Sequence, residues 1–167
     1  MGAGILPVAE YKGNIYYLFS QEVSDKKYSD FGGAPSPRNE SRFDNAIREG
    51  YEETDGFFGT KSELKKKVND NYIIRLDTHN GYHAYLFKIQ YDSLLPNYFN
   101  NHHKFIQSNF PTKINKHGFF EKNNMKWFTV NELKDKYKFR SFYKEIIELI
   151  INNSNLIKSL VINKRIK

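Results

Sequence analysis

Three glutamates close together in the chain are the side chains best placed for metal chemistry. Glu49, Glu52 and Glu53 would lie within an arc of roughly 100° on a helix, because each residue advances an α-helix by about 100°. Carboxylates this close repel one another and weaken the helix unless a cation lies among them. Their oxygens are the ligands that Mg²⁺ and Mn²⁺ prefer. The alternative interpretation is an acidic, solvated helix face that binds nothing.

The residues around this acidic run favour a metal site over a solvated surface. Gly32-Gly33 precedes a proline-containing loop, and a glycine lets the backbone approach a ligand closely and offer it a carbonyl group. Arg48 can reach Glu52 one turn later on the same helix. The chain has no cysteine, so oxygen or imidazole must hold any metal, which again indicates a hard cation.

The spacing of these charged residues resembles the signature of the Nudix hydrolases. That signature is Gly, five residues, Glu, seven residues, Arg-Glu, a hydrophobic residue, any residue, Glu-Glu, any residue, Gly and a hydrophobic residue. In this chain Glu40, seven residues and then Arg48-Glu49-x-x-Glu52-Glu53 match it. Residues 33–56 carry the specific resemblance.

Three positions in this segment depart from the signature. Six residues rather than five separate Gly33 from Glu40, Gly50 occupies the hydrophobic position, and Asp55 stands where glycine is expected. The charged residues are intact, so these departures affect the loop and the helix more than the metal ligands.

The resemblance implies a fold, a reaction and a set of roles. The fold would be of the α/β (α+β) class, a Nudix fold with a mixed β-sheet sandwiched between α-helices. The reaction would be hydrolysis of a phosphoanhydride bond in a nucleoside diphosphate linked to another moiety, with Mg²⁺ or Mn²⁺ as cofactor. Glu40 and Arg48 would brace the loop and the helix. The predicted metal ligands are Gly33, Glu49, Glu52 and Glu53, and the predicted catalytic residues are Arg48, Glu49, Glu52, Glu53 and Glu121.

Glu121 enters this set because many Nudix members use a further acid outside the signature, as a metal ligand or as the general base. It lies ahead of Trp127 in a predicted strand, where it could equally be a surface residue. Glu132 competes less well, because it completes a capping-box pattern with Thr129. Glu49 is the other candidate for the base.

The charge balance favours a polyanionic partner. The formal net charge is +7 and the pI about 9.4, although abundant Lys and Asn could also reflect an AT-rich genome. Lys27, Arg38 and Arg75 are the predicted contacts to substrate phosphates, with an ordinary surface role as the alternative. The basic balance, the aromatic richness and the Asp30-Phe-Gly-Gly sequence resemble RNA-decapping and diphosphoinositol-cleaving members, some of them viral. Capped RNA is therefore one candidate substrate.

Two interpretations from other classes compete with the hydrolase. One is a catalytically inactive Nudix-fold protein that binds nucleotide or RNA, which the departures at Gly50 and Asp55 would suit. The other is a basic RNA-binding module with a coincidental acidic helix. Activity that depends on Glu52 and Glu53 would separate the hydrolase from both.

Hydrophobic periodicity and turn residues predict the elements that must position these side chains. The predicted strands are 4–9, 15–22, 28–31, 72–77, 82–91 and 119–128, and the predicted helices are 42–54, 62–68 and about 141–151, with another starting at the 129–132 capping box. Residues 92–118 are predicted to be an irregular insertion with at most a short helix, and the Asn-rich stretches at 97–101 and 152–155 to be loops.

Length and composition favour a single domain over residues 1–167, with a basic C-terminal tail at about 159–167, and the resemblance implies that this is a Nudix domain. The apolar stretch Ile146–Ile151 is too short to span a bilayer, and the N-terminus lacks the basic region of a secretory signal. We therefore expect a cytoplasmic protein (in the host cytoplasm if viral) without a membrane partner. A homodimer is common for the fold.

Overall fold

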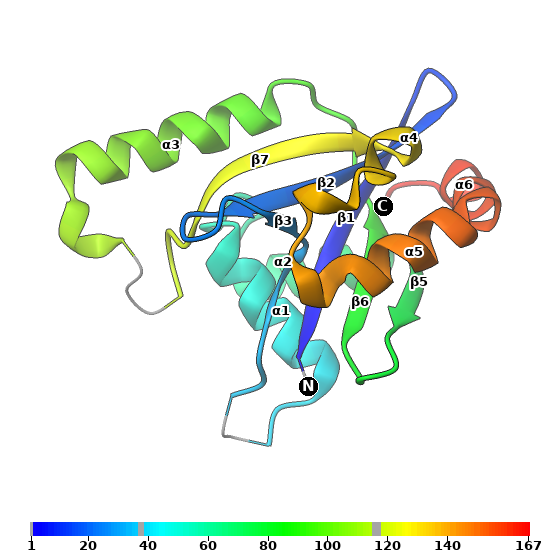
Figure 1. Cartoon of the computed structure of the whole chain (residues 1–167), viewed down its shortest axis with the longest axis horizontal. Helices are drawn as coiled ribbons and strands as arrows, with labels where there is room; N and C mark the ends of the chain where they lie inside the picture. The colour runs from blue at the N-terminus through cyan, green and yellow to red at the C-terminus, as the bar shows by residue number, and fades with distance from the viewer. Residues whose placement is uncertain (1, 37–38, 115–117) are drawn as a thin grey trace.

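The strands of the described residues form one mixed, seven-stranded sheet (Figure 1). The computed structural model describes residues 2–36, 39–114 and 118–167. The N-terminal hairpin pairs Val8 with Tyr17, and its first strand also runs parallel to the strand that begins at His83. The strands are β1 (Ala3–Tyr11), β2 (Asn14–Glu22), β3 (Tyr28–Ser29), β4 (Phe31–Gly33), β5 (Tyr72–Asp77), β6 (His83–Lys88) and β7 (Lys122–Thr129).

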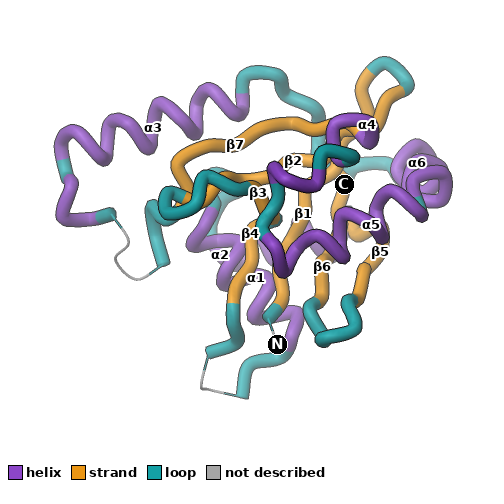
Figure 2. Tube along the Cα trace, viewed as in Figure 1, coloured by secondary structure: helices purple, strands orange, loops and turns teal. Residues whose placement is uncertain are grey.

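Helices cover both faces of this sheet (Figures 1 and 2). The helices are α1 (Arg42–Glu53), α2 (Lys61–Asp70), α3 (Leu95–Asn109), α4 (Val130–Leu133), α5 (Lys144–Asn152) and α6 (Ser154–Asn163). Short 3-10 turns lie at Pro111–Lys113, Lys136–Lys138 and Ser141–Tyr143. Among the described residues, no helix is long and apolar enough to cross a membrane.

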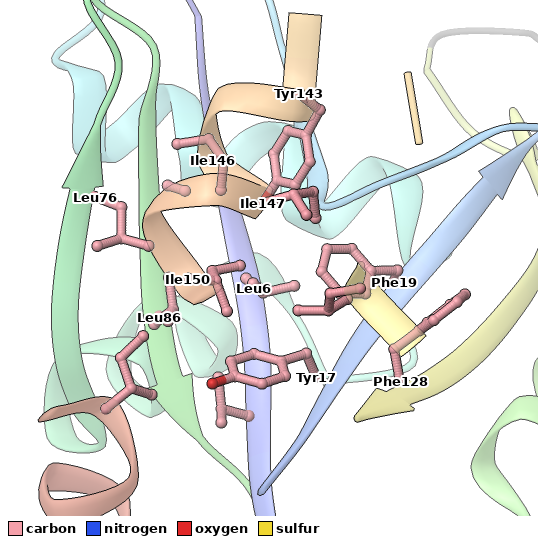
Figure 3. Close-up of a cluster of buried hydrophobic side chains, with 14 of the residues drawn as sticks. Leu6, Tyr17, Phe19, Leu76, Leu86, Phe128, Tyr143, Ile146, Ile147 and Ile150 are labelled. Atoms are coloured by element: carbon pink, nitrogen blue, oxygen red, sulfur yellow. The ribbon is translucent and has the colours of Figure 1, made fainter. Parts of the chain in front are cut away.

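Alternation along β1 and β2 divides the core into two clusters, because successive strand residues point to opposite faces of a sheet. Ile5 and Leu18 belong to the cluster that packs against α1 and α2. Leu6 and Tyr17 belong to the cluster that packs against α5 and α6. Figure 3 shows this second cluster, in which Ile146, Ile147 and Ile150 of α5 pack with Leu6, Tyr17 and Phe19 on one face of the sheet. The sheet is therefore buried on both faces and gives α1 a rigid support.

The predicted elements of the first 90 residues are confirmed with small shifts at their ends, except that the predicted strand 28–31 is divided at Asp30 into β3 and β4, which pair with different strands. The predicted strand at 119–128 begins later, at Lys122, because Phe120 adopts a left-handed backbone conformation (φ 61°) that a strand cannot include.

The prediction of an irregular insertion at 92–118 is wrong, since α3 occupies 15 residues of it. The many asparagines of this segment have low helix propensity, which argued against a helix. The residues buried by α3, Phe99, His103 and Ile106, nevertheless follow a helical spacing. This helix packs along β7 (Figure 2). His102 and His103 therefore lie on a helix and not in an irregular segment.

The predicted basic tail at 159–167 is also wrong over part of its length. Residues up to Asn163 are helical in α6, which buries Ile157 and Val161 against the sheet. The last residues lie on the domain as well, because the backbone N–H of Lys167 donates to Asn71 Oδ1 at 2.8 Å.

A buried carboxyl lies where β3 leads into β4, immediately before the Gly-Gly segment. Asp30 is fully buried and accepts a hydrogen bond from the Tyr82 hydroxyl at 2.7 Å. Gly4 makes room for it, because a Cβ there would approach Asp30 Oδ2 to 2.5 Å. Burial raises the pKa of Asp30 to about 7, although the Tyr82 hydroxyl, the Lys122 ammonium and the Tyr143 hydroxyl oppose the shift.

This buried carboxyl predicts a pH-dependent stability. Asp30 has a higher pKa when folded than the usual 3.8, so between these values the folded protein holds the extra proton. The free energy of unfolding should therefore fall as the pH rises from about 4 to about 7, by at most about 1.4 kcal/mol per pH unit from this group. Asp30→Asn should remove this contribution in urea unfolding measured across that range. Asp77→Asn, on an exposed edge of β5, is the matched control. Equal pH slopes for wild type and Asp30→Asn would show that the carboxyl is ionised in the folded protein.

Candidate functional site

The acidic run lies on α1, which begins where the sequence predicts. The Ser41 side chain accepts the backbone N–H of Asp44 at 3.0 Å and caps the helix. One face of α1 buries Ala46 and Ile47 against the sheet. This packing holds the backbone of the helix, and so directs its glutamates towards the loop that follows β4.

Arg48 connects the three acids around it to the loop. Its Nε lies 3.2 Å from both carboxylate oxygens of Glu40, and its Nη1 lies 2.8 Å from Glu49 and 3.0 Å from Glu52. Its Nη2 donates to the carbonyl of Ala34 at 3.2 Å. The structure thus brings Arg48 and Glu40 together in the arrangement expected of bracing residues, and places one cationic nitrogen between Glu49 and Glu52.

Glycines let these carboxylates approach the backbone. A Cβ on Gly33 would come within 2.6 Å of Glu49 Oε2, so a side chain there would push this carboxylate away. Gly118, in the left-handed region at φ 82°, lies against Glu52 in the same way, with a Cβ-to-Oε2 approach of 2.7 Å. The carbonyl oxygen of Gly33, which the sequence predicts as a metal ligand, lies against Gly2.

Glu53 differs from the other two acids because it is buried, with 4% of its surface exposed. Its Oε2 accepts the backbone N–H of Gly32 at 2.8 Å, and its Oε1 lies 3.1 Å from the ammonium of Lys122. Lys122 is fully buried and also pairs with Glu22 on β2. Burial lowers the pKa of Lys122, but attraction to Glu53 and Glu22 more than offsets this, so its pKa is raised and it stays charged.

Glu121 faces the same group of acids from the segment before β7. Its carbonyl accepts the backbone N–H of Val23 at 3.3 Å, and its side chain lines the cleft above α1. Burial raises the pKa of Glu49, the guanidinium of Arg48 opposes this, and the charges of Glu52 and Glu121 raise it further. The acid chosen outside the signature is therefore close enough to act on the same ligand.

These residues surround an open, polar cleft with a volume of about 820 Å³. Its lining residues are Glu22, Gly32, Gly33, Ala34, Ser36, Arg48, Glu49, Glu52, Glu53, Gly118, Glu121 and Arg140. Arg140 forms an ion pair with Glu22 at 2.8 Å and remains partly exposed. The cleft thus combines a cluster of acids with two cationic side chains at its edges.

A second cavity of about 450 Å³ adjoins the cleft and shares the Gly-Gly segment and Arg140 with it. Its other walls include Pro35, Tyr82 and Phe142, of which Phe142 is 38% exposed. The guanidinium of Arg140 lies 5.2 Å from the centre of the Phe142 ring. The two cavities together could accept a ligand with an anionic part and an aromatic part.

Unlike the acids, the predicted phosphate contacts Lys27 and Arg75 do not lie at the cleft. Arg75 pairs with Asp77 on β5 at 2.8 Å, and neither Arg75 nor Lys27 lines the cleft. Arg38 lies outside the described residues. Sequence analysis missed Arg140 and Lys122, because each lies far along the chain from the acids and no local pattern marks it.

The donor set of the cleft fits a hard divalent cation, because it offers carboxylate oxygens without sulfur or imidazole. Within residues 2–36, 39–114 and 118–167, no group of three or more His, Cys, Asp or Glu side chains is already arranged to hold a metal ion. Arg48 and Lys122 neutralise the acids instead. One guanidinium nitrogen of Arg48 thus bridges Glu49 and Glu52.

No protein-family model matches the chain, and no curated protein sequence matches it significantly. Solved structures do match it. The structure of a C. elegans Ap4A hydrolase binary complex aligns over 95% of this chain and 99% of that chain, at 19% identity and a TM-score of 0.56.

A second similar structure is a bifunctional NMN adenylyltransferase/ADP ribose pyrophosphatase from Francisella tularensis. It aligns over 90% of this chain and 40% of its own length, at 14% identity and a TM-score of 0.53. The complex of that protein with AMP and a Mn ion aligns at 14% identity, over 90% of this chain and 41% of that one, with a TM-score of 0.50. At these identities the likeness establishes the fold, and it confirms the predicted Nudix fold, a mixed sheet sandwiched between helices.

Proposed function

We propose that this protein is a divalent-metal-dependent hydrolase that cleaves a phosphoanhydride bond in a nucleoside diphosphate linked to another group. The observation that carries the proposal is the convergence of Glu49 and Glu52 on one nitrogen of Arg48, at 2.8 and 3.0 Å, in the cleft beside the Gly-Gly segment. Carboxylates that converge on one positive nitrogen would converge in the same way on a bound cation. The same fold in an Ap4A hydrolase and an ADP ribose pyrophosphatase supports the reaction class.

Mg²⁺ or Mn²⁺ is the proposed cofactor, with Glu49 and Glu52 as its principal ligands. When bound, the cation would neutralise the diphosphate and lower the pKa of a water molecule. Glu53 lies in the floor of the cleft and orients the Gly-Gly segment by accepting the N–H of Gly32. The Mn ion in the complex of the Francisella protein supports the choice of metal.

Two acids are candidates for the general base. Glu49 is the first, because it lies in the cleft against Gly33 and beside Glu52. Glu121 is the second, since it lines the same cleft and is not engaged by Arg48. Arg140, at the boundary of the two cavities, would bind a substrate phosphate that bridges them.

The second cavity favours a nucleoside over a diphosphoinositol phosphate as the rest of the substrate. Phe142, which is 38% exposed, offers aromatic surface that suits the planar face of a base. Among the described residues that line this cavity, Arg140 is the one cationic side chain, whereas an inositol ring with several phosphates needs several cations. Capped RNA and dinucleoside polyphosphates both place a base beside an anhydride, and both belong in the substrate panel.

Removing one of the two converging carboxylates should abolish hydrolysis. Phosphate-product release would be measured with Mg²⁺ or Mn²⁺ for capped RNA, dinucleoside polyphosphates, ADP-ribose, nucleoside triphosphates and diphosphoinositol phosphates. Glu52→Gln should reduce the wild-type rate by about 100-fold or more, because it removes a proposed metal ligand while keeping its shape.

Glu148→Gln is the matched control, since Glu148 pairs with Lys136 on the exposed side of α5 and should not affect the rate. Hydrolysis by Glu52→Gln at the wild-type rate would refute the metal site. Binding of panel members without cleavage by the wild type would instead favour a non-catalytic nucleotide-binding protein.

Truncation of the exposed aromatic wall should weaken nucleotide binding selectively. Phe142→Ala should reduce the affinity for AMP by about 10-fold, the loss expected for one base–aromatic stacking contact. Inorganic tripolyphosphate has no base, so its affinity should not change. Isothermal titration calorimetry would measure both ligands, with Phe105→Ala, an exposed aromatic on α3, as control. Equal losses for AMP and tripolyphosphate would contradict a base site in the second cavity.

A further inference from the structure

Asp55 stands at the position where the Nudix signature has glycine, immediately after α1 and its C-cap Thr54. Its backbone adopts the left-handed conformation, with φ 51°. This conformation explains the glycine of the signature, and it costs about 1 kcal/mol or more for a residue with a Cβ. A contact of the Asp55 side chain must therefore offset the free-energy cost of this backbone conformation.

The side chain of Asp55 makes that contact across the molecule. Its Oδ1 accepts the backbone N–H of Phe120 at 2.8 Å, a link between residues 65 positions apart. Phe120 is itself in the left-handed region, at φ 61°. The hydrogen bond thus joins two residues in sparsely populated conformations, which persist only where the surroundings hold them.

The segment tied down in this way leads directly to Glu121. Just before it, Gly118 lies against the carboxylate of Glu52, and the ring of Phe119 packs edge-on against Tyr51 of α1 at 5.5 Å. Glu121 follows at the wall of the cleft, and Lys122 begins β7. Within the described segment 118–121, the hydrogen bond from the Phe120 N–H to Asp55 is the one hydrogen bond to a side chain. It fixes the backbone immediately before Glu121.

We propose that Asp55 is a positioning residue: its carboxylate holds segment 118–121 against the end of α1 and thereby holds Glu121 at the cleft. The inference rests on the proposed hydrolase function, because the contribution of Glu121 to the reaction is part of that function. A purely local role for Asp55 at the helix end predicts the opposite behaviour on mutation, since glycine suits the left-handed conformation better.

Two substitutions separate these roles. Asp55→Gly relieves the backbone strain but removes the acceptor, whereas Asp55→Asn tolerates the left-handed conformation and keeps an oxygen for the Phe120 N–H. We expect Asp55→Gly to fold with an unfolding midpoint near that of wild type. Its kcat should fall by about 10- to 100-fold with little change in KM, the range typical of groups that orient a reacting residue. Asp55→Asn should remain close to wild type.

Hydrogen exchange of the Phe120 amide tests the contact without reference to catalysis. Exchange should accelerate by about 10-fold or more in Asp55→Gly and stay slow in Asp55→Asn. In a Glu121→Gln background, Asp55→Gly should cause no further loss of kcat, because the two residues act through one position.

Wild-type kcat or unchanged Phe120 protection in Asp55→Gly would overturn the proposal. Loss of kcat in Asp55→Asn equal to that in Asp55→Gly would overturn it too, because the charge and not the hydrogen bond would then matter. If the wild type hydrolyses no member of the substrate panel, the proposed function fails. The Phe120 exchange rates still decide in that case whether Asp55 holds the segment.

Discussion

The buried ammonium of Lys122 is the contact on which the geometry of the cleft depends. It joins β7 to Glu53 at the end of α1 and to Glu22 on β2. Glu53 in turn holds the N–H of Gly32, so the segment after β4 is tied to the same group. Removing one partner from a buried pair of this kind typically costs about 3–5 kcal/mol, because the remaining charge is left unpaired. The ammonium of Lys122 therefore holds β2, β7, the end of α1 and the Gly-Gly segment in place around the cleft.

A second cation, Arg48, balances the acids that face the open part of the cleft. It contacts Glu40, Glu49, Glu52 and the Ala34 carbonyl at once, so the loop and the helix share its five donors. The ion pairs of Arg48 and Lys122 offset the repulsion among the three neighbouring glutamates of α1. The two cations engage acids in different surroundings, because Lys122 pairs with the buried Glu53 and Arg48 pairs with Glu49 and Glu52 in the open cleft.

The departures from the Nudix signature have physical causes in the packing around α1. Gly50 replaces a hydrophobic residue where the helix crosses β1 closely, since a Cβ there would approach Ile5 Cδ1 to 2.4 Å. Asp55 replaces a glycine and keeps the left-handed backbone that the glycine would favour, while its side chain reaches Phe120. Both departures preserve the course of the helix and leave its charged residues in place.

The sequence by itself determined the local features of the site. Helical spacing placed Glu49, Glu52 and Arg48 within reach of one another, Ser41 capped the helix, and alternation in the first two strands gave the sheet two buried faces. These properties depend on residues a few positions apart, whose geometry the backbone conformation dictates. Local sequence patterns did not predict α3, because its asparagines have low helix propensity. The helix is stabilised by packing its buried residues against β7.

Only the tertiary structure decided which distant residues complete the cleft. Sheet pairing and helix packing bring Lys122 to Glu22 across 100 positions and Arg140 to Glu22 across 118, and they leave Arg75 paired with Asp77 instead. The burial of Glu53 follows from the same packing, because its position on α1 faces β7 and the Gly-Gly segment. No periodicity encodes such contacts, since each arises where separate elements meet in the folded core.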